Sequence, residues 1–126
     1  MKKTRIIIVE DNNIISLDLM HSLEKMGYEI VSIIEEGEEA VKEILNLKPD
    51  LVIMDIKLRD EIDGIEVSER IHKVSNIPVL FVSAYADEDT IRRATKSLNK
   101  INYIVKPFHN TELYNSIETI LNKNKN

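Results

Sequence analysis

The nine residues RIIIVEDNN, from Arg5 to Asn13, contain the pattern on which the fold prediction depends. Four consecutive apolar residues, 6–9, are typical of a strand that is buried on both faces of a parallel sheet. Glu10 and Asp11 follow this run directly, although repulsion between neighbouring carboxylates and their partial desolvation both cost stability. A buried strand that ends in two acids therefore predicts a site at its carboxyl end that uses their charge.

Short runs rich in Val and Ile alternate with longer amphipathic segments along the chain. The expected strands are residues 5–9, 29–34, 51–54, 79–82 and 102–105. Apolar residues recur at helical spacing in the segments that follow them, which predicts five helices. Because strands that alternate with helical crossovers form a parallel sheet covered on both faces, we expect an α/β fold with a single doubly wound five-stranded sheet.

Each expected helix has an apolar stripe that should face the sheet. In chain order the stripes are Ile15, Leu19, Ser22, Leu23 and Met26; Ala40, Val41, Ile44, Leu45 and Leu47; Val67, Ile71 and Val74; Ile91, Ala94 and Leu98; and Leu113, Ile117, Ile120 and Leu121. Gly27 is expected to end the first helix, and the pair Asp63-Gly64 to begin the third.

The composition of the 126-residue chain fits one globular domain. A formal charge of −5 argues against a protein built mainly to bind nucleic acid. The chain has no cysteine, which excludes disulfides and thiolate metal sites, and no apolar run approaches the ~18 residues of a membrane span. We therefore expect a cytoplasmic protein with one domain at 1–122, a polar tail at 123–126, and no output domain after Leu121.

Further polar residues follow the other strands at the edge where parallel sheets bind ligands. Asp55 follows the third expected strand, Ser83 the fourth and Lys106 the fifth. If these strands lie beside the first, their side chains converge with Glu10 and Asp11. Three crowded carboxylates require a cation, and their oxygen ligands suit Mg²⁺. Asp55 could then act as a nucleophile that forms an aspartyl phosphate, with Lys106 and the metal offsetting phosphoryl charge and Ser83 hydrogen-bonding a phosphoryl oxygen.

These residues stand in motifs that resemble the receiver domain of two-component response regulators from end to end. The motifs are IIIVEDN, PDLVIMDIKL, DGIE, IPVLFVSAYAD and YIVKPF, in the order and spacing of that family. The resemblance implies a flavodoxin-like sheet with strand order 2-1-3-4-5. It also implies a phosphorylation-controlled signalling switch, in which Asp55 accepts a phosphoryl group from a histidine kinase or a histidine phosphotransfer protein.

The same resemblance assigns the metal ligands. It implies that Asp11 and Asp55 bind Mg²⁺ directly, that Glu10 assists through water, and that the backbone carbonyl of Lys57 is a further ligand. One loop departs from the commonest family pattern, because Arg59 stands where the family has Pro and the segment LRDEI lengthens the loop by one residue.

The resemblance also implies how phosphorylation changes the protein. Lys106 would pair with the phosphate, Ser83 would move toward it, and Tyr103 would turn inward behind Ser83. These movements would alter the face made by helix four, strand five and helix five, which an unidentified downstream protein would bind. The family has a cis peptide before Pro107, whereas X-Pro bonds are in general more often trans.

The first helix carries a second apolar feature on its outward side. If Leu19 and Leu23 face the core, Ile14 and Leu17 stand on the opposite side, beside the Asp11 end of the site. Singly exposed apolar residues are common and often have no function. The alternative is that this pair packs on a helix of the phosphodonor and serves as a kinase-docking surface.

Three other functions fit the sequence less well. A Mg²⁺-dependent aspartyl-phosphate phosphatase of the haloacid dehalogenase type would need a second acid two residues after Asp55, where Lys57 stands. A flavodoxin-like electron carrier would need a loop rich in Ser, Thr and Gly after the first strand, where the chain has EDNNI. A receiver-like docking module that is never phosphorylated would lack an acid or the lysine, and none is missing. The sequence favours a switch that promotes only its own phosphorylation and dephosphorylation.

Overall fold

Strands and helices alternate in chain order throughout the computed structural model, which describes residues 2–97 and 101–124. The strands are β1 (Arg5–Val9), β2 (Glu29–Ile34), β3 (Leu51–Met54), β4 (Val79–Ser83) and β5 (Ile101–Val105). The helices are α1 (Asn13–Lys25), α2 (Gly37–Leu47), α3 (Gly64–His72), α4 (Glu88–Ser97) and α5 (Asn110–Asn124). All the expected strands are present, and their bounds differ from the prediction by one residue at most.

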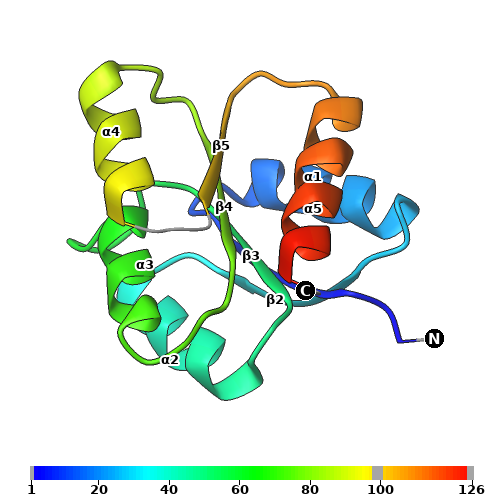
Figure 1. The fold of residues 1–126 in the computed structure, drawn as a ribbon, viewed down its shortest axis with the longest axis horizontal. Helices are drawn as coiled ribbons and strands as arrows, with labels where there is room; N and C mark the ends of the chain where they lie inside the picture. Colours follow the sequence, from blue (N-terminus) through cyan, green and yellow to red (C-terminus); the bar gives the residue numbers. More distant parts are fainter. Residues whose placement is uncertain (1, 98–100, 125–126) are drawn as a thin grey trace.

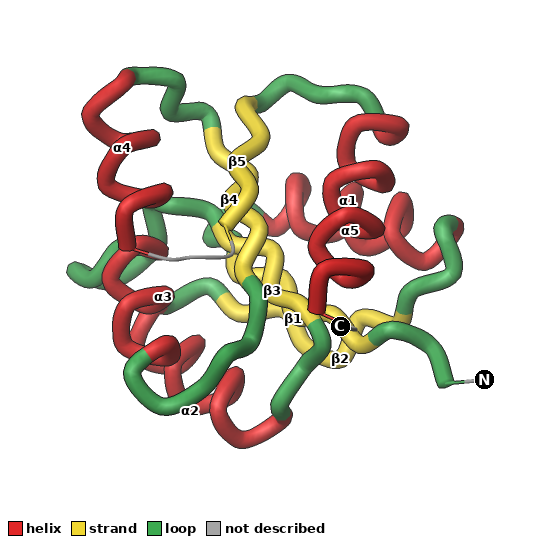
Figure 2. Tube along the Cα trace, viewed as in Figure 1, coloured by secondary structure: helices red, strands yellow, loops and turns green. Residues whose placement is uncertain are grey.

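The strands form one parallel sheet with the order β2-β1-β3-β4-β5. Helices α2, α3 and α4 cover one face of this sheet, and α1 and α5 cover the other (Figures 1 and 2). The doubly wound α/β fold and its strand order are thereby confirmed. The order reverses beside β1, and in such sheets the crevice at the carboxyl ends of the strands at that point is where ligands bind.

The apolar residues of β1 divide between two cores. Ile6 and Ile8 pack under α1 and α5, whereas Ile7 and Val9 pack under α2 and α3. The division arises because successive side chains of a strand point to opposite faces of the sheet. A strand covered on both faces must therefore be apolar at every position, which explains the uninterrupted run at residues 6–9.

The predicted helix stripes face the sheet, with one exception. The buried members are Leu19, Leu23, Ala40, Ile44, Val67, Ile71, Ala94, Leu113, Ile117 and Ile120. The prediction for Val74 is wrong, because its side chain is 72% exposed. Helix α3 ends at His72, and the chain then leaves the helical path toward β4, so position 74 no longer lies on the inward face.

Two other expectations concern the ends of elements. Leu98, expected on the fourth helix, lies outside the described residues. Helix α5 continues to Asn124 and therefore includes the first two residues of the segment 123–126 that was expected to be a polar tail. Among the described residues, no helix has the length and apolar character needed to cross a bilayer.

Candidate functional site

The predicted site residues converge at the carboxyl edge of the sheet. Backbone hydrogen bonds extend the strand pairing one residue beyond β3 and β5. The Asp55 N–H donates to the Val9 carbonyl (2.9 Å), and the Lys106 N–H donates to the Ser83 carbonyl (2.8 Å). These bonds hold the residues that follow β3 and β5 in register with their neighbours, so their side chains enter the same space.

An acidic cluster lies at the ends of β1 and β3. Glu10, Asp11 and Asp55 each offer one carboxylate oxygen, and these oxygens lie within 4.8 Å of one another. Glu10 is only 3% exposed, whereas the other two acids are partly exposed. Burial and the charge of Asp55 raise the pKa of Glu10 from 4.5 to about 7, against the opposing effect of Lys106. Oxygen ligands in such a cluster suit a hard divalent cation.

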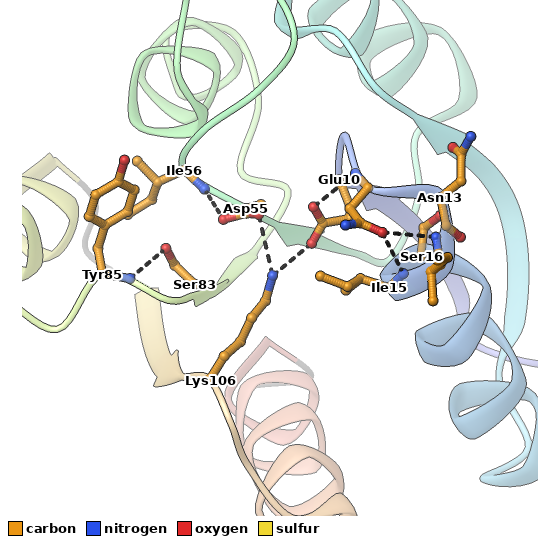
Figure 3. A network of polar contacts seen from close by, with 11 residues as sticks. Glu10, Asn13, Ile15, Ser16, Asp55, Ile56, Ser83, Tyr85 and Lys106 are labelled. Atoms are coloured by element: carbon orange, nitrogen blue, oxygen red, sulfur yellow. Dashed lines mark hydrogen bonds and ion pairs between the residues drawn. The ribbon is translucent and has the colours of Figure 1, made fainter.

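Lys106 supplies the positive charge of the site. Figure 3 shows its side chain extending between Glu10 and Asp55, with Nζ 2.8 Å from Glu10 Oε1 and 3.3 Å from Asp55 Oδ2. Burial alone would lower the pKa of Lys106, but its bond to Glu10 and the two negative charges raise it above the ordinary value. Lys106 therefore stays cationic at neutral pH. The peptide bond between Lys106 and Pro107 is cis, as the family resemblance implies.

The carboxylate of Asp55 is oriented from both sides. Its Oδ1 accepts a hydrogen bond from the Ile56 N–H (2.7 Å), while Oδ2 faces Lys106. The following loop returns directly beneath it, because the Gly64 N–H donates to the Ile56 carbonyl (2.7 Å). A Cβ atom at position 64 would lie 2.0 Å from the Asp55 carbonyl oxygen, so only glycine permits this approach. The DGIE motif thus both begins α3 and closes the loop around Asp55.

The two predicted switch residues meet at Tyr85. Ser83 is fully buried, and its Oγ accepts a hydrogen bond from the Tyr85 N–H (3.2 Å; Figure 3). Tyr103 is partly buried, its ring centroid lies 6.1 Å from that of Phe81, and its hydroxyl donates to the Tyr85 carbonyl (2.7 Å). Tyr85 was not predicted as a site residue. It takes part through its backbone N–H and carbonyl, and a pattern of side chains in the sequence does not indicate which backbone groups will form such contacts.

Helix α1 begins directly beside the acidic cluster. Asn12 is its N-cap, and Asn12 Oδ1 accepts hydrogen bonds from the N–H groups of Ile14 (2.9 Å) and Ile15 (3.1 Å). Ile14 is 81% exposed and Leu17 is 49% exposed. The predicted exposure of this apolar pair is confirmed, and its role in docking stays a prediction. Lys57 lies in the loop after Asp55 with an exposed side chain, and the role of its carbonyl also stays a prediction.

Residues 6–118 match the sequence profile of the response regulator receiver domain. The chain belongs to this family. Such receiver domains accept phosphoryl groups from histidine kinases or phosphotransfer proteins, and they bind Mg²⁺ at an acidic pocket. In this chain an acidic cluster lies at the carboxyl edge of the sheet.

The similar proteins include transcriptional regulators. Over 119 residues the chain is 36% identical to the transcriptional regulatory protein PdtaR of Mycobacterium tuberculosis, covering 94% of this chain and 57% of that protein. It is 31% identical over 122 residues to the alkaline phosphatase synthesis transcriptional regulatory protein PhoP of Bacillus subtilis, covering 96% of this chain and 50% of that one. The chain thus spans about half the length of these relatives.

Solved receiver domains have the same fold. The signal receiver domain of a modulated diguanylate cyclase from Desulfovibrio desulfuricans superposes with a TM-score of 0.89 at 32% identity, covering 98% of both chains. A response regulator receiver domain protein from Methanospirillum hungatei gives a TM-score of 0.89 at 28% identity, again covering 98% of both.

Proposed function

We propose that this receiver domain is a phosphorylation-controlled switch in which Asp55 accepts a phosphoryl group in a Mg²⁺-dependent reaction. The observation that supports it best is the combination around Asp55. One carboxylate oxygen is held by a backbone N–H, the other lies 3.3 Å from a cationic lysine, and two further carboxylates stand within reach of a shared cation. An ordinary strand-terminal Asp would lack the lysine and the two further carboxylates.

Each residue of the site would have a distinct chemical role. Asp55 attacks the phosphorus of the donor's phosphohistidine, so that an O–P bond forms as the N–P bond breaks. Lys106 lies where it can pair with a phosphoryl oxygen and offset its charge. Asp11 and Asp55 would bind the metal directly, with Glu10 acting through water and the Lys57 carbonyl as a further ligand. Bound Mg²⁺ supplies additional positive charge toward the phosphoryl oxygens.

The contacts of Tyr85 favour a switch that involves Ser83 and Tyr103. In the present conformation the Ser83 hydroxyl is turned toward the Tyr85 N–H, and Tyr103 is held by the Tyr85 carbonyl. A phosphoryl group on Asp55 would offer Ser83 a charged acceptor, which is the stronger kind of hydrogen-bond partner. Movement of Ser83 would then release the Tyr85 segment, which leads into α4, and alter the α4-β5-α5 face offered to a downstream protein.

The donor is a histidine kinase or a histidine phosphotransfer protein that contacts α1. Ile14 and Leu17, three and six residues after Asp11, form an exposed apolar pair on α1, and truncation of an interface anchor commonly costs ~1–3 kcal/mol. Replacing both by alanine should slow transfer from such a protein roughly ten- to a hundredfold. Transfer from acetyl phosphate should be unchanged, because this small donor needs no docking surface. Equal slowing with both donors would mean that the pair serves the fold, and slowing with neither would place docking elsewhere.

The decisive experiment is phosphorylation with acetyl phosphate and Mg²⁺, followed by intact mass measurement. The protein should gain one base-labile phosphoryl group, and Asp55→Asn should abolish the gain. Asp18→Asn is the matched control, because it removes the same charge from an exposed position on α1. EDTA should stop the reaction, since without a cation the acidic cluster repels the incoming phosphate. Equal labelling of Asp55→Asn and the control would refute the assignment.

A further inference from the structure

The loop that follows Asp55 is attached to α2 at its outer end. The Gly37 N–H donates to Asp60 Oδ1 (2.7 Å), and the Glu38 N–H donates to Asp60 Oδ2 (3.0 Å). Both oxygens of one carboxylate therefore bind the first two N–H groups of the helix. Although burial acts in the other direction, these two bonds hold the pKa of Asp60 below its ordinary value. The carboxylate is charged at neutral pH and also complements the helix dipole.

Helix α2 takes this cap from a distant part of the chain. Glu36 occupies its N-cap position with an extended backbone, yet among the described residues its side chain makes no capping hydrogen bond. The first N–H groups of a helix have no partner within the helix and need one from elsewhere. Asp60, 23 residues after Gly37, provides it. The loop and the start of α2 are consequently bound to each other rather than folded independently.

Two further contacts hold the same part of the loop on α2. The Arg59 N–H donates to the Glu35 carbonyl (3.1 Å), and the side chains of these residues form an ion pair at 2.6 Å. Ile62 covers Gly37 so closely that a Cβ atom at position 37 would lie 2.3 Å from Ile62 Cγ1. An exposed ion pair adds little stability by itself. The backbone bond and the apolar contact, however, hold the same loop against the start of α2 as the Asp60 bonds do.

The inner end of the loop is fixed to the phosphoacceptor. Ile56 donates its N–H to Asp55 Oδ1 (2.7 Å) and accepts through its carbonyl from the Gly64 N–H (2.7 Å). Lys57 therefore lies between two attachments, one at Asp55 and one at Asp60. The orientation of the Lys57 peptide depends on both, because a short strip of backbone has few ways to join two fixed points.

We propose that Asp60 is a positioning residue that holds the loop on α2 and thereby presents Lys57 to the metal site. This inference rests on the proposed function, since it concerns the same Mg²⁺ site. The simpler alternative is that Asp60 only caps α2. Positioning has a consequence that capping lacks. If Asp60 strengthens Mg²⁺ binding through the loop, Mg²⁺ binding must strengthen the Asp60 bonds to α2 by the same factor.

The first experiment measures the Mg²⁺ affinity of the Asp60→Ala variant in a titration monitored by amide NMR. Removing groups that orient a metal ligand typically weakens metal binding roughly 10–100-fold. Asp60 acts through the loop, so the loss should lie near the lower end, about tenfold. In the unmodified protein, Mg²⁺ should also shift the amide signals of Gly37 and Glu38, and these remote shifts should disappear in the variant. Unchanged affinity in Asp60→Ala would overturn the proposal.

A second variant separates positioning from capping. Glu36→Ser, added to Asp60→Ala, supplies a local cap of the preferred type at the start of α2. It should restore the start of the helix without restoring the attachment of the loop, so Mg²⁺ binding should stay about tenfold weaker than in the unmodified protein. Recovery of Mg²⁺ affinity together with the helix would show that Asp60 is only a cap. Asp87→Ala is the control, because Asp87 likewise accepts from a helix N-terminus, Thr90 N (3.0 Å) at the start of α4, and is not part of the loop; it should leave Mg²⁺ binding unchanged.

The outcomes distinguish this inference from the proposed function. If the unmodified protein binds no Mg²⁺ and gains no phosphoryl group, both are wrong. If the unmodified protein binds Mg²⁺ and gains a phosphoryl group, but the Asp60 variants bind Mg²⁺ as tightly as the Asp87→Ala control, the inference is wrong and the proposed function stands. Should Asp60→Ala fail to fold, Asp60→Asn keeps one acceptor oxygen and should give an intermediate Mg²⁺ affinity. An affinity equal to that of the unmodified protein, together with unchanged shifts at Gly37 and Glu38, would count against positioning.

Discussion

Glu10 makes the stability of the metal-free protein depend on pH in an unusual direction. Its carboxyl group is buried beside Asp55, which raises its pKa from 4.5 to about 7. In the unfolded chain the same group ionises near 4.5. Between these two values the folded state binds more protons than the unfolded state, so the free energy of unfolding falls as pH rises. The contribution is fully present below about pH 4.5 and is lost as pH rises through 7.

The size of the effect follows from the two pKa values. One pKa unit corresponds to about 1.4 kcal/mol. Between about pH 5.5 and about pH 8, Glu10 should therefore lower the free energy of unfolding by roughly 2 kcal/mol. Mg²⁺ should reverse this loss at the higher pH, because a bound cation replaces the proton as the partner of the negative charge. Mg²⁺ affinity should accordingly increase with pH.

The assay is urea unfolding in EDTA at both pH values, with Glu10→Gln as the comparison. The amide has nearly the shape of the acid but cannot ionise, so other titrating groups contribute equally to both proteins. The difference in unfolding free energy between the two proteins should change by roughly 2 kcal/mol across the window, in favour of the variant at high pH. A difference that stays constant with pH would show that folded Glu10 is ionised throughout, and the electrostatic account of the site would be wrong.

Three further predictions concern single residues. Lys106→Ala should leave Mg²⁺ affinity unchanged or increase it, because it removes a cation that lies 2.8 Å from Glu10; weaker binding in an NMR titration would contradict this. Gly64→Ala should lower the free energy of unfolding in urea by ~1–3 kcal/mol or more, since its Cβ would lie 2.0 Å from the Asp55 carbonyl oxygen. A negligible change would mean that the loop shifts to accommodate the added Cβ at little cost. Burial lowers the pKa of His72, so stability should fall as pH drops below about 6.5, and this dependence should be absent from His72→Gln.

The strands and most of the site were predictable because the patterns that encode them are local. An uninterrupted apolar run means burial on both faces, and the residue after it must stand at the sheet edge. Asp55 and Lys106 were placed correctly by this argument alone. The prediction for Val74 was wrong for the converse reason. Helical spacing continues to position 74, but the helix ends at His72 and the chain turns toward β4.

Residues that act through contacts with distant segments could not be predicted from sequence. Tyr85 binds Ser83 and Tyr103 through its backbone N–H and carbonyl, which every non-proline residue possesses. Asp60 stands in a loop that the sequence shows only to be one residue longer than usual. Its partners on α2 lie more than twenty positions earlier, and nothing in their side chains indicates a bond to it.

The sequence by itself determined the alternation of strands and helices, the burial of the central strands, and the identity of the charged residues at the sheet edge. Backbone geometry sets these features within a few residues, so they can be read from spacing. Only the tertiary structure decided that Lys106 Nζ lies between Glu10 and Asp55, and that Asp60 caps α2. Such contacts join separate segments, and they depend on how loops close and how helices pack on the sheet. Those are properties of the whole folded chain.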